Sequence, residues 1–370
     1  MNDRESNLAA SILLVTYNRV NMLRRCVSAV LANTQGVEYE LIVWDNASTD
    51  GSSEYLDEVA SANPRVRVVH SPENIGLNGV AASVRLARGN YLLEMDDDVI
   101  DVPSGWLAEM IRSFEAMPRA GYLAANVVQN DLTDGAKLAP ENYTVVDFGN
   151  GVLIEFGPLG GWCSITSARV IADVGNFLEM PGRIFFGEDN DFVERCVIAG
   201  YRVGIVSSVR VFHAAGAIAN KEFGCIDVCK LKYSDDPGYA PFLRHTLEVE
   251  GNTSVRCPDA LGAAISDDSV THIPGTSGQA SLATRWTPPL DELGMSRALD
   301  LADISRSPFV AELRLKKQFS SGDYTGARRL LWQARSLNPS TVRRCAMLIL
   351  GFASPRMLAA RWRRLSQQQD

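Results

Sequence analysis

The sequence lacks any apolar run long enough to cross a membrane. Its longest candidate, residues 345–353, is far shorter than the roughly 20 residues that a membrane-spanning helix requires. It also lacks an excess of positive charge. The 370 residues carry a net charge of -8, which argues against nucleic acid as the main partner. With 46% apolar and 22% charged residues, the composition is that of an ordinary globular protein with a sizeable core.

Two further features are missing, a disulfide-type cysteine pattern and a secretion signal. The seven cysteines are an odd number, and several, such as Cys26, Cys163 and Cys196, lie in apolar segments. This distribution fits reduced thiols in a core, so we expect no disulfides. The apolar run 8–15 is followed by polar residues 16–19 rather than by a small-residue cleavage site, and it therefore predicts a strand. A cytoplasmic protein is the expectation.

The sequence does contain two groups of acids. Asp96, Asp97 and Asp98 follow the apolar run 91–95, and Glu-Asp-Asn-Asp occupies positions 188–191. Three adjacent carboxylates repel one another, and their hard oxygen atoms suit Mg²⁺ or Mn²⁺ rather than Zn²⁺. The two groups together predict a metal-dependent transferase, whereas the triplet taken alone is equally typical of a solvated acidic turn.

Strand-like and helix-like segments alternate along the first hundred residues. Strands are predicted at 11–15, 40–44, 66–70 and 91–95, separated by segments of helical period. This alternation predicts an α/β fold with a mixed, mostly parallel sheet and helices on both faces. Ligands gather outside the carboxyl ends of such strands, so Asp45, Asn74 and the aspartate triplet should converge at one crevice.

Beyond the triplet the pattern is less regular. Helices are predicted at 106–117, 167–174 and 190–199, and strands at 202–206 and 209–213. Few periodic signals occur between residues 118 and 160. The helix near 190 would carry the second acidic group in its first turn.

Six short motifs follow one another along the chain. They are Val-Thr-Tyr-Asn-Arg at 15–19, Val-Trp-Asp-Asn-Ala-Ser-Thr-Asp-Gly at 43–51, Glu-Asn-Ile-Gly at 73–76, Met-Asp-Asp-Asp at 95–98, Phe-Gly-Glu-Asp-Asn-Asp at 186–191 and Val-Phe-His at 211–213. In this order and spacing they resemble family 2 glycosyltransferases of the GT-A fold, over about residues 11–216. The resemblance implies a Rossmann-like domain that transfers a sugar from a nucleotide-sugar donor to an acceptor hydroxyl with inversion. The Met-Asp-Asp-Asp-Val form is similar to that of rhamnosyl and galactofuranosyl transferases.

The resemblance also implies roles for individual residues. On the nucleotide-sugar side it places Thr16, Tyr17, Asn18, Asp45, Asn74, Gly76, Asp96 and Asp97. The ligands of Mn²⁺ or Mg²⁺ would be Asp96, Asp98 and His213, and the acceptor would meet Trp162 and Glu188. Asp189 would be the base that removes the proton of the acceptor hydroxyl.

Purely structural interpretations remain open for three of these residues. An acid such as Asp189 at a helix start can cap the N-terminus and complement the helix dipole. His213 at a strand end can be an ordinary satisfied polar residue. Trp162, with its large apolar area, fits burial in the core as well as stacking on an acceptor sugar.

The expected domain organisation has three parts. A GT-A domain would span 8–216, with a nucleotide-binding half at about 8–130 and an acceptor half at 131–216. Residues 217–305 are rich in Pro, Gly, Ser and Asp and predict an irregular linker or acceptor-side region. Residues 306–370 predict a helical C-terminal extension with one tetratricopeptide-like hairpin and a basic amphipathic tail, which suits an anionic membrane surface.

We expect a UDP- or dTDP-linked sugar as donor and a glycan or lipid-linked acceptor, as in cell-surface polysaccharide assembly. The protein would then lie in the cytoplasm or peripherally on the inner face of the cell membrane. Two alternatives remain open. One is a glycosyltransferase with a peptide or protein acceptor, and the other is a catalytically inactive GT-A scaffold.

Overall fold

The computed structural model describes residues 8–130, 132–133, 137–234 and 239–252. All of them lie within one compact unit. The predicted tetratricopeptide-like hairpin and the predicted basic tail lie outside the described residues.

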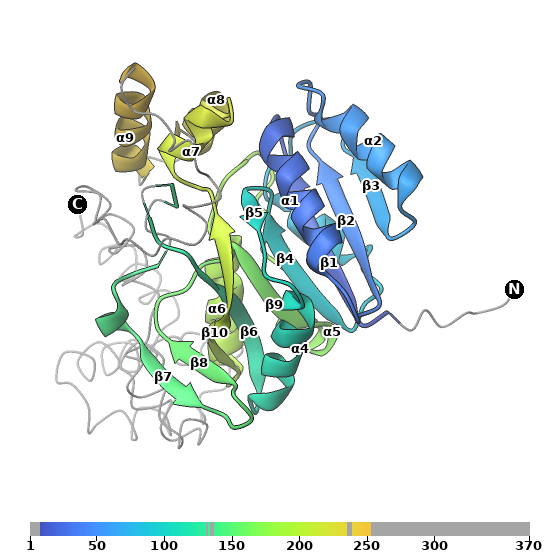
Figure 1. The fold of residues 1–370 in the computed structure, drawn as a ribbon, viewed down its shortest axis with the longest axis vertical. Coiled ribbons are helices and arrows are strands. Elements are labelled where there is room, and N and C mark those ends of the chain that lie inside the picture. Colours follow the sequence, from blue (N-terminus) through green and yellow to red (C-terminus); the bar gives the residue numbers. More distant parts are fainter. Residues whose placement is uncertain (1–7, 131, 134–136, 235–238, 253–370) are drawn as a thin grey trace, which may run out of the picture. The chain divides into compact units, whose positions relative to one another are not determined.

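The amino-terminal half is a parallel sheet of apolar strands (Figure 1). Its strands, in the spatial order β3-β2-β1-β4, are β1 (Ala10–Thr16), β2 (Tyr39–Asp45), β3 (Val66–His70) and β4 (Tyr91–Asp96). The helices between them are α1 (Val20–Asn33), α2 (Ser52–Ala62) and α3 (Asn78–Val84). The strands read as apolar runs in the sequence because a parallel strand buried on both faces needs apolar side chains on both.

The second half mixes strand directions. β9 (Cys163–Ser167) runs antiparallel between β4 and β6 (Ala120–Val127), and β10 (Arg202–His213) is parallel to β6. The hairpin of β7 (Thr144–Asp147) and β8 (Leu153–Phe156) continues the sheet beyond β10. Seven strands of the described sheet, β3, β2, β1, β4, β6, β10 and β7, therefore point the same way. The predicted mixed, mostly parallel α/β sheet is confirmed.

Helices cover both faces of this half. α4 (Trp106–Ala116) and α6 (Glu188–Ile198) each contact β6 and β10. Figure 1 shows α4 in front of these strands and α6 behind them. A shorter helix, α5 (Ala168–Val174), contacts β9. Ser167 caps α5, because its side chain accepts a hydrogen bond from the backbone N–H of Val170.

Several predicted elements differ from the observed ones. The region 118–160 contains β6, β7, β8 and a short 3₁₀ turn at Pro140–Asn142, and these elements were not predicted. The two strands predicted at 202–206 and 209–213 form one strand, β10, with an irregular register between Val206 and Arg210. β7 and β8 span only four residues each, too few alternations to give a clear period-two signal, and β6 is buried along nearly its whole length and so does not alternate.

The expectation of irregular chain from residue 217 is wrong for its first part. This part forms α7 (Ala217–Glu222), α8 (Ile226–Ser234) and α9 (Ala240–Gly251). α8 and α9 pack on each other through Cys229, Tyr233 and Phe242. The apolar residues of α8 are spread around the helix instead of along one stripe, so the sequence shows little helical period there.

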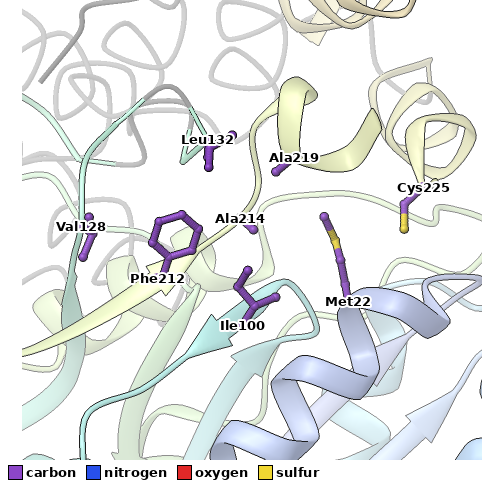
Figure 2. Packing of buried hydrophobic residues seen from close by; sticks show 8 residues of the cluster. All are labelled: Met22, Ile100, Val128, Leu132, Phe212, Ala214, Ala219 and Cys225. Atoms are coloured by element: carbon purple, nitrogen blue, oxygen red, sulfur yellow. The ribbon is translucent and has the colours of Figure 1, made fainter. Parts of the chain in front are cut away.

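A small apolar core holds together the segments that carry the aspartate triplet and His213 (Figure 2). Its buried members are Met22, Ile100, Val128, Leu132, Phe212, Ala214, Ala219 and Cys225. Ile100 belongs to β5 (Val99–Asp101), which directly follows the triplet and pairs antiparallel with the end of β10. Since Phe212 and Ala214 flank His213, packing of this core fixes the histidine beside the aspartates.

Membrane-spanning candidates were sought among the helices of the described residues, and none has both the length and the apolar character that a span requires.

Candidate active site

A cavity of about 330 Å³ opens at the carboxyl ends of β1, β4 and β10. Its walls come from segments that are far apart in the sequence: the turn after β1, the aspartate triplet, the start of α6, and helices α8 and α9. The convergence expected from parallel strand order is therefore observed for Asn74 and the aspartate triplet, but not for Asp45, which does not line the cavity.

Three potential ligands for a metal ion meet in this cavity. Asp96, Asp98 and His213 each offer one donor atom, and these atoms all lie within 4.8 Å of one another. The Nε2 atom of His213 lies 2.9 Å from Oδ1 of Asp98 and 3.2 Å from Oδ2 of Asp96. The structure thus brings together the three residues that the sequence predicted as metal ligands.

The donor set fits a divalent cation. Oδ1 of Asp98 and both ring nitrogens of His213 are buried, and none has a hydrogen-bond partner in the described part of the chain. Nε2 of His213 nevertheless lies within ion-pair distance of both carboxylates, and atoms held this close together can share a bound cation instead. Carboxylate oxygens with one imidazole suit Mn²⁺ or Mg²⁺. Burial lowers the pKa of His213, but the carboxylates of Asp98 and Asp96 outweigh it and raise the pKa to about 9.

Arg19 supports the aspartate triplet and was not singled out from the sequence. Its Nη1 donates to Oδ1 of Asp97 at 2.7 Å and to Oδ2 of Asp98 at 2.8 Å, and its Nη2 donates to Oδ1 of Asn220 at 3.2 Å. Burial would raise the pKa of Asp98, but the charges of His213 and Arg19 hold it well below its usual value. The signal was the arginine that ends the Thr-Tyr-Asn-Arg turn, since three adjacent carboxylates need a nearby cation.

Thr16 and Asp97 lie in the cavity wall, but their side chains bind each other. Oγ1 of Thr16 donates to Oδ2 of Asp97 at 2.8 Å, and Arg19 occupies the other carboxylate oxygen. Both residues are buried. In this arrangement they join the turn after β1 to the triplet.

The predicted nucleotide side divides into residues that line the cavity and residues that do not. Tyr17, Asn74 and Gly76 line it, and so does Asn46, which was not predicted.

Asp45 and Asn18, which were also predicted on the nucleotide side, do not line the cavity. Asp45 accepts hydrogen bonds from the Ser48 backbone, from Ser53 and from the ring of His70, and Asn18 accepts from the backbone N–H of Thr49. The structure therefore uses both side chains to shape the loop after β2.

The segment 176–184, which links α5 to the second acidic motif, packs against the loop before α3. Gly76 has φ +58°, and a Cβ atom there would lie 2.0 Å from the carbonyl oxygen of Ile184. The backbone N–H of Leu77 donates to the same oxygen at 3.0 Å. Glycine is therefore required at position 76 both for its positive φ and for this close approach.

Asp189 points into the cavity from the first turn of α6. Its Oδ2 accepts from the backbone N–H of Gly161 at 2.8 Å and its Oδ1 from that of Asn190 at 2.7 Å. The helix N-cap is Gly187, with no side-chain cap bond, and Asp189 lies within the first turn, where it accepts from one of the N–H groups of the helix start. Burial raises the pKa of Asp189 above its ordinary value, against the effect of the two amides.

Two further buried carboxyl groups adjoin Asp189. Glu188 lines the cavity, and its Oε2 has no hydrogen-bond partner within the described residues. Glu94 of β4 accepts from the hydroxyl of Tyr122 at 2.9 Å and was missed from the sequence, because it lies in an apolar run. Burial and neighbouring carboxylates raise the pKa of both glutamates well above the usual value.

Trp162 is a buried residue that also contributes to the cavity wall. Its Nε1 donates to the carbonyl oxygen of Ala125 at 2.8 Å, and its ring stacks on that of His213 with centroids 6.2 Å apart. The indole therefore helps to orient the histidine. An acceptor contact through Trp162 stays a prediction.

Comparison with known proteins adds three findings. A family model described as glycosyl transferase family 2 matches residues 11–165. Chondroitin synthase from Pasteurella multocida is 33% identical over 24% of this chain and 9% of its own length, and glycosyltransferase GlyG from Streptococcus pneumoniae is 30% identical over 34% of this chain and 41% of its own length. The chain thus spans less than half the length of these curated relatives.

Among solved structures, one similar fold is that of the mannosyltransferase PcManGT from Pyrobaculum calidifontis, in complex with GDP-Man and Mn²⁺. The alignment covers 84% of this chain and 86% of that chain, with 16% identity and a TM-score of 0.43.

Proposed function

We propose that this chain, which belongs to glycosyl transferase family 2 through residues 11–165, is an inverting transferase. It transfers a sugar from a nucleoside-diphosphate sugar to an acceptor hydroxyl. One observation carries the proposal: the Asp96, Asp98 and His213 group and the carboxylate of Asp189 line the same cavity. A metal-binding group suits the leaving diphosphate, and a separate carboxylate suits the attacking hydroxyl.

The donor lies with its diphosphate at the metal-binding group. Asp96, Asp98 and His213 would hold Mn²⁺ or Mg²⁺, which when bound stabilises the negative charge of a leaving diphosphate as a Lewis acid. The nucleoside extends toward Asn46, Asn74 and Gly76. Arg19 keeps Asp98 ionised and fixed in place for this task.

Asp189 acts as the general base. The acceptor oxygen forms a bond to the anomeric carbon, the bond from that carbon to the diphosphate oxygen breaks, and the hydroxyl proton passes to Asp189. A base works best when its pKa lies near the working pH, and the raised pKa of Asp189 moves it in that direction. The amides of Gly161 and Asn190 hold the carboxylate in one orientation.

The acceptor occupies the side of the cavity near Glu188, whose free Oε2 can accept a hydrogen bond from a sugar hydroxyl. A glycan acceptor agrees with the name of one relative, chondroitin synthase. A UDP- or dTDP-linked donor, a rhamnosyl or galactofuranosyl group, and a lipid-linked acceptor at the membrane surface are the finer parts of this hypothesis, and they rest on the motif resemblance.

A thermal-shift screen of the purified protein tests the donor site. UDP, GDP, dTDP and their sugars are each added with Mn²⁺, Mg²⁺ or EDTA. A ligand at 100 times its Kd stabilises the folded state by about 2.7 kcal/mol, which raises the melting temperature measurably. We expect a shift for one base that EDTA removes. No shift with any nucleotide in any metal would contradict the proposed function.

A further inference from the structure

A lysine on α8 contributes to the wall of the cavity. Lys232 lies in the last turn of α8 and lines the cavity together with Asp96, Asp98 and His213. The sequence analysis assigned it no role, because it falls in the stretch after 217 that was expected to be irregular. The helix that carries it is fixed by packing of Tyr233 and Phe242 between α8 and α9.

In the described part of the chain, the ammonium group of Lys232 lies against two aromatic rings and not against a carboxylate. Its Nζ lies 4.5 Å from the ring centroid of Phe185 and 5.7 Å from that of Tyr233. Within the described residues it makes no hydrogen bond or ion pair. Aromatic faces attract an ammonium group but leave its N–H donors free, and they exclude water, which strengthens its interaction with other charges.

The cavity is lined by many carboxyl groups, so a diphosphate that binds there needs an additional positive charge beside it. The described lining includes the carboxyl groups of Glu94, Asp96, Asp97, Asp98, Glu188 and Asp189. Arg19 is committed through both Nη atoms to Asp97, Asp98 and Asn220. Lys232 is therefore the lysine or arginine of this lining whose charged group is not already engaged.

We propose that Lys232 binds the diphosphate of the donor, so that α8 forms part of the donor site and the diphosphate lies between the lysine and the Asp96, Asp98 and His213 group. This inference rests on the proposed function and adds a substrate-binding residue to it. Lysine suits the role because its ammonium is a compact point charge with three donors on a flexible stem. Breakage of the donor bond leaves additional negative charge on the diphosphate, which the ammonium then stabilises.

The test is the binding of nucleoside diphosphates and of the matching nucleosides to the full chain in the presence of MnCl₂. Calorimetry gives the Kd of UDP, GDP and dTDP, and ligand-observed NMR gives that of the nucleosides. Lys232→Met removes the charge but keeps an unbranched apolar stem. The matched control is Lys230→Met on the same helix, because Lys230 pairs with Asp227 and Glu250 and does not line the cavity.

We expect Lys232→Met to raise the Kd of the diphosphate that the wild type binds by about tenfold or more, since a hydrogen bond to a charged group is lost. The Kd of the nucleoside should stay within about twofold, Lys230→Met should bind as wild type does, and Lys232→Arg should recover part of the affinity. Lys232→Gln repeats the comparison with a polar side chain, in case the methionine variant fails to fold.

Two results would overturn the inference alone: unchanged diphosphate binding in Lys232→Met and Lys232→Gln, or an equal loss for diphosphate and nucleoside, which would indicate a structural role. A wild-type protein that binds no nucleoside diphosphate with the metal would overturn both the inference and the proposed function.

Discussion

At the scale of single residues, Asp189 can act as a base only while its carboxylate is ionised and correctly oriented. We predict that Asp189→Asn lowers sugar transfer by about 10²- to 10⁴-fold, the usual contribution of a general base, because the amide cannot accept the proton. Nucleotide binding should change little, since the proposed role of Asp189 is toward the acceptor hydroxyl and not the nucleotide. Transfer rates and Kd values measured on the same preparation check both parts.

The control for Asp189 is Asp191→Asn. Asp191 lies in the same helical turn but pairs with Arg195 and does not line the cavity. Wild-type turnover in Asp189→Asn, or an equal loss in both variants, would remove Asp189 as the base.

Arg19 is the buried counter-charge of the triplet. We predict that Arg19→Met destabilises the protein by about 3–5 kcal/mol, the cost of leaving buried carboxylates without their partner. Urea denaturation of wild type and variant measures this. Arg85→Met removes an exposed arginine that pairs with Glu179, and should cost no more than about 1 kcal/mol. Similar losses in the two variants would refute the structural role assigned to Arg19.

At the residue scale, the sequence predicted which side chains could bind a metal ion or accept a proton. It did not predict which side chains form hydrogen bonds and ion pairs with one another. The two acidic groups stand out as clusters of carboxylates, whereas the roles of His213 and Asp189 came from the motif resemblance. Arg19 beside Asp97 and Asp98 depends on which way a turn folds back, and Asp45 turning toward Ser53 and His70 depends on the local loop path. A single sequence predicts neither the direction of this turn nor the path of this loop.

At the scale of elements, Asn78 at the start of α3 holds the segment 176–184. Its amide nitrogen, which carries two N–H groups, lies within hydrogen-bond distance of the carbonyl oxygens of Ile75, Met180 and Arg183, and its Oδ1 accepts from the backbone N–H of Met180 at 2.7 Å. We predict that Asn78→Ala destabilises the protein by about 2–4 kcal/mol, at about 1 kcal/mol for each lost bond. The amide of Met180 should also exchange its hydrogen faster.

The variant Asn78→Asp distinguishes the hydrogen bond that the Asn78 side chain accepts from those that it donates. An aspartate keeps the acceptor for the Met180 amide but loses the donors to the carbonyl groups, so it should retain more exchange protection at Met180 than alanine does. Hydrogen exchange followed by mass spectrometry distinguishes the variants. Equal protection in wild type and Asn78→Ala would show that other contacts hold the segment.

Element prediction succeeded where a pattern was long and periodic, and it failed where the pattern was short or, as in β6, where burial leaves no alternation. α1 repeats buried apolar residues at Met22, Leu23, Cys26, Val27 and Val30, and this helical spacing is visible in the sequence. β7 spans only Thr144–Asp147 and leaves Val145 56% exposed, so its four residues do not mark a core face. β9 was also missed, because its position between β4 and β6 is a property of the whole sheet.

At the scale of the whole molecule, the order of parallel strands was the strongest guide. It placed Asn74 and the triplet at one edge before any contact was known, because connections in parallel sheets bring strand ends together. The approach of His213 required β10 to lie beside β6 and to pair with β5. Such non-local register cannot be read from periodicity, and here the motif resemblance supplied the residue.

The stability of the whole fold depends on a buried carboxylate at the end of the sheet away from the cavity. Glu40 of β2 is 2% exposed, and it accepts hydrogen bonds from Ser11, Arg67 and Arg88. Burial alone would raise its pKa, but these bonds lower it from 4.5 to about 2. Because the folded pKa lies below the unfolded one, the stabilisation is fully present above about pH 4.5 and is lost as the pH falls toward 2.

A shift of this size corresponds to about 3 kcal/mol of unfolding free energy, at about 1.4 kcal/mol for each pKa unit. We therefore predict that Glu40→Gln is less stable than wild type by about this amount at pH 7, and that the difference shrinks between pH 4.5 and pH 2. Urea denaturation of both proteins at pH 7, 5 and 3 measures the difference. Nucleotide binding at pH 7 should be unchanged, because Glu40 does not line the cavity. A stability difference that stays constant across this pH range would mean that Glu40 contributes through packing and not through its charge.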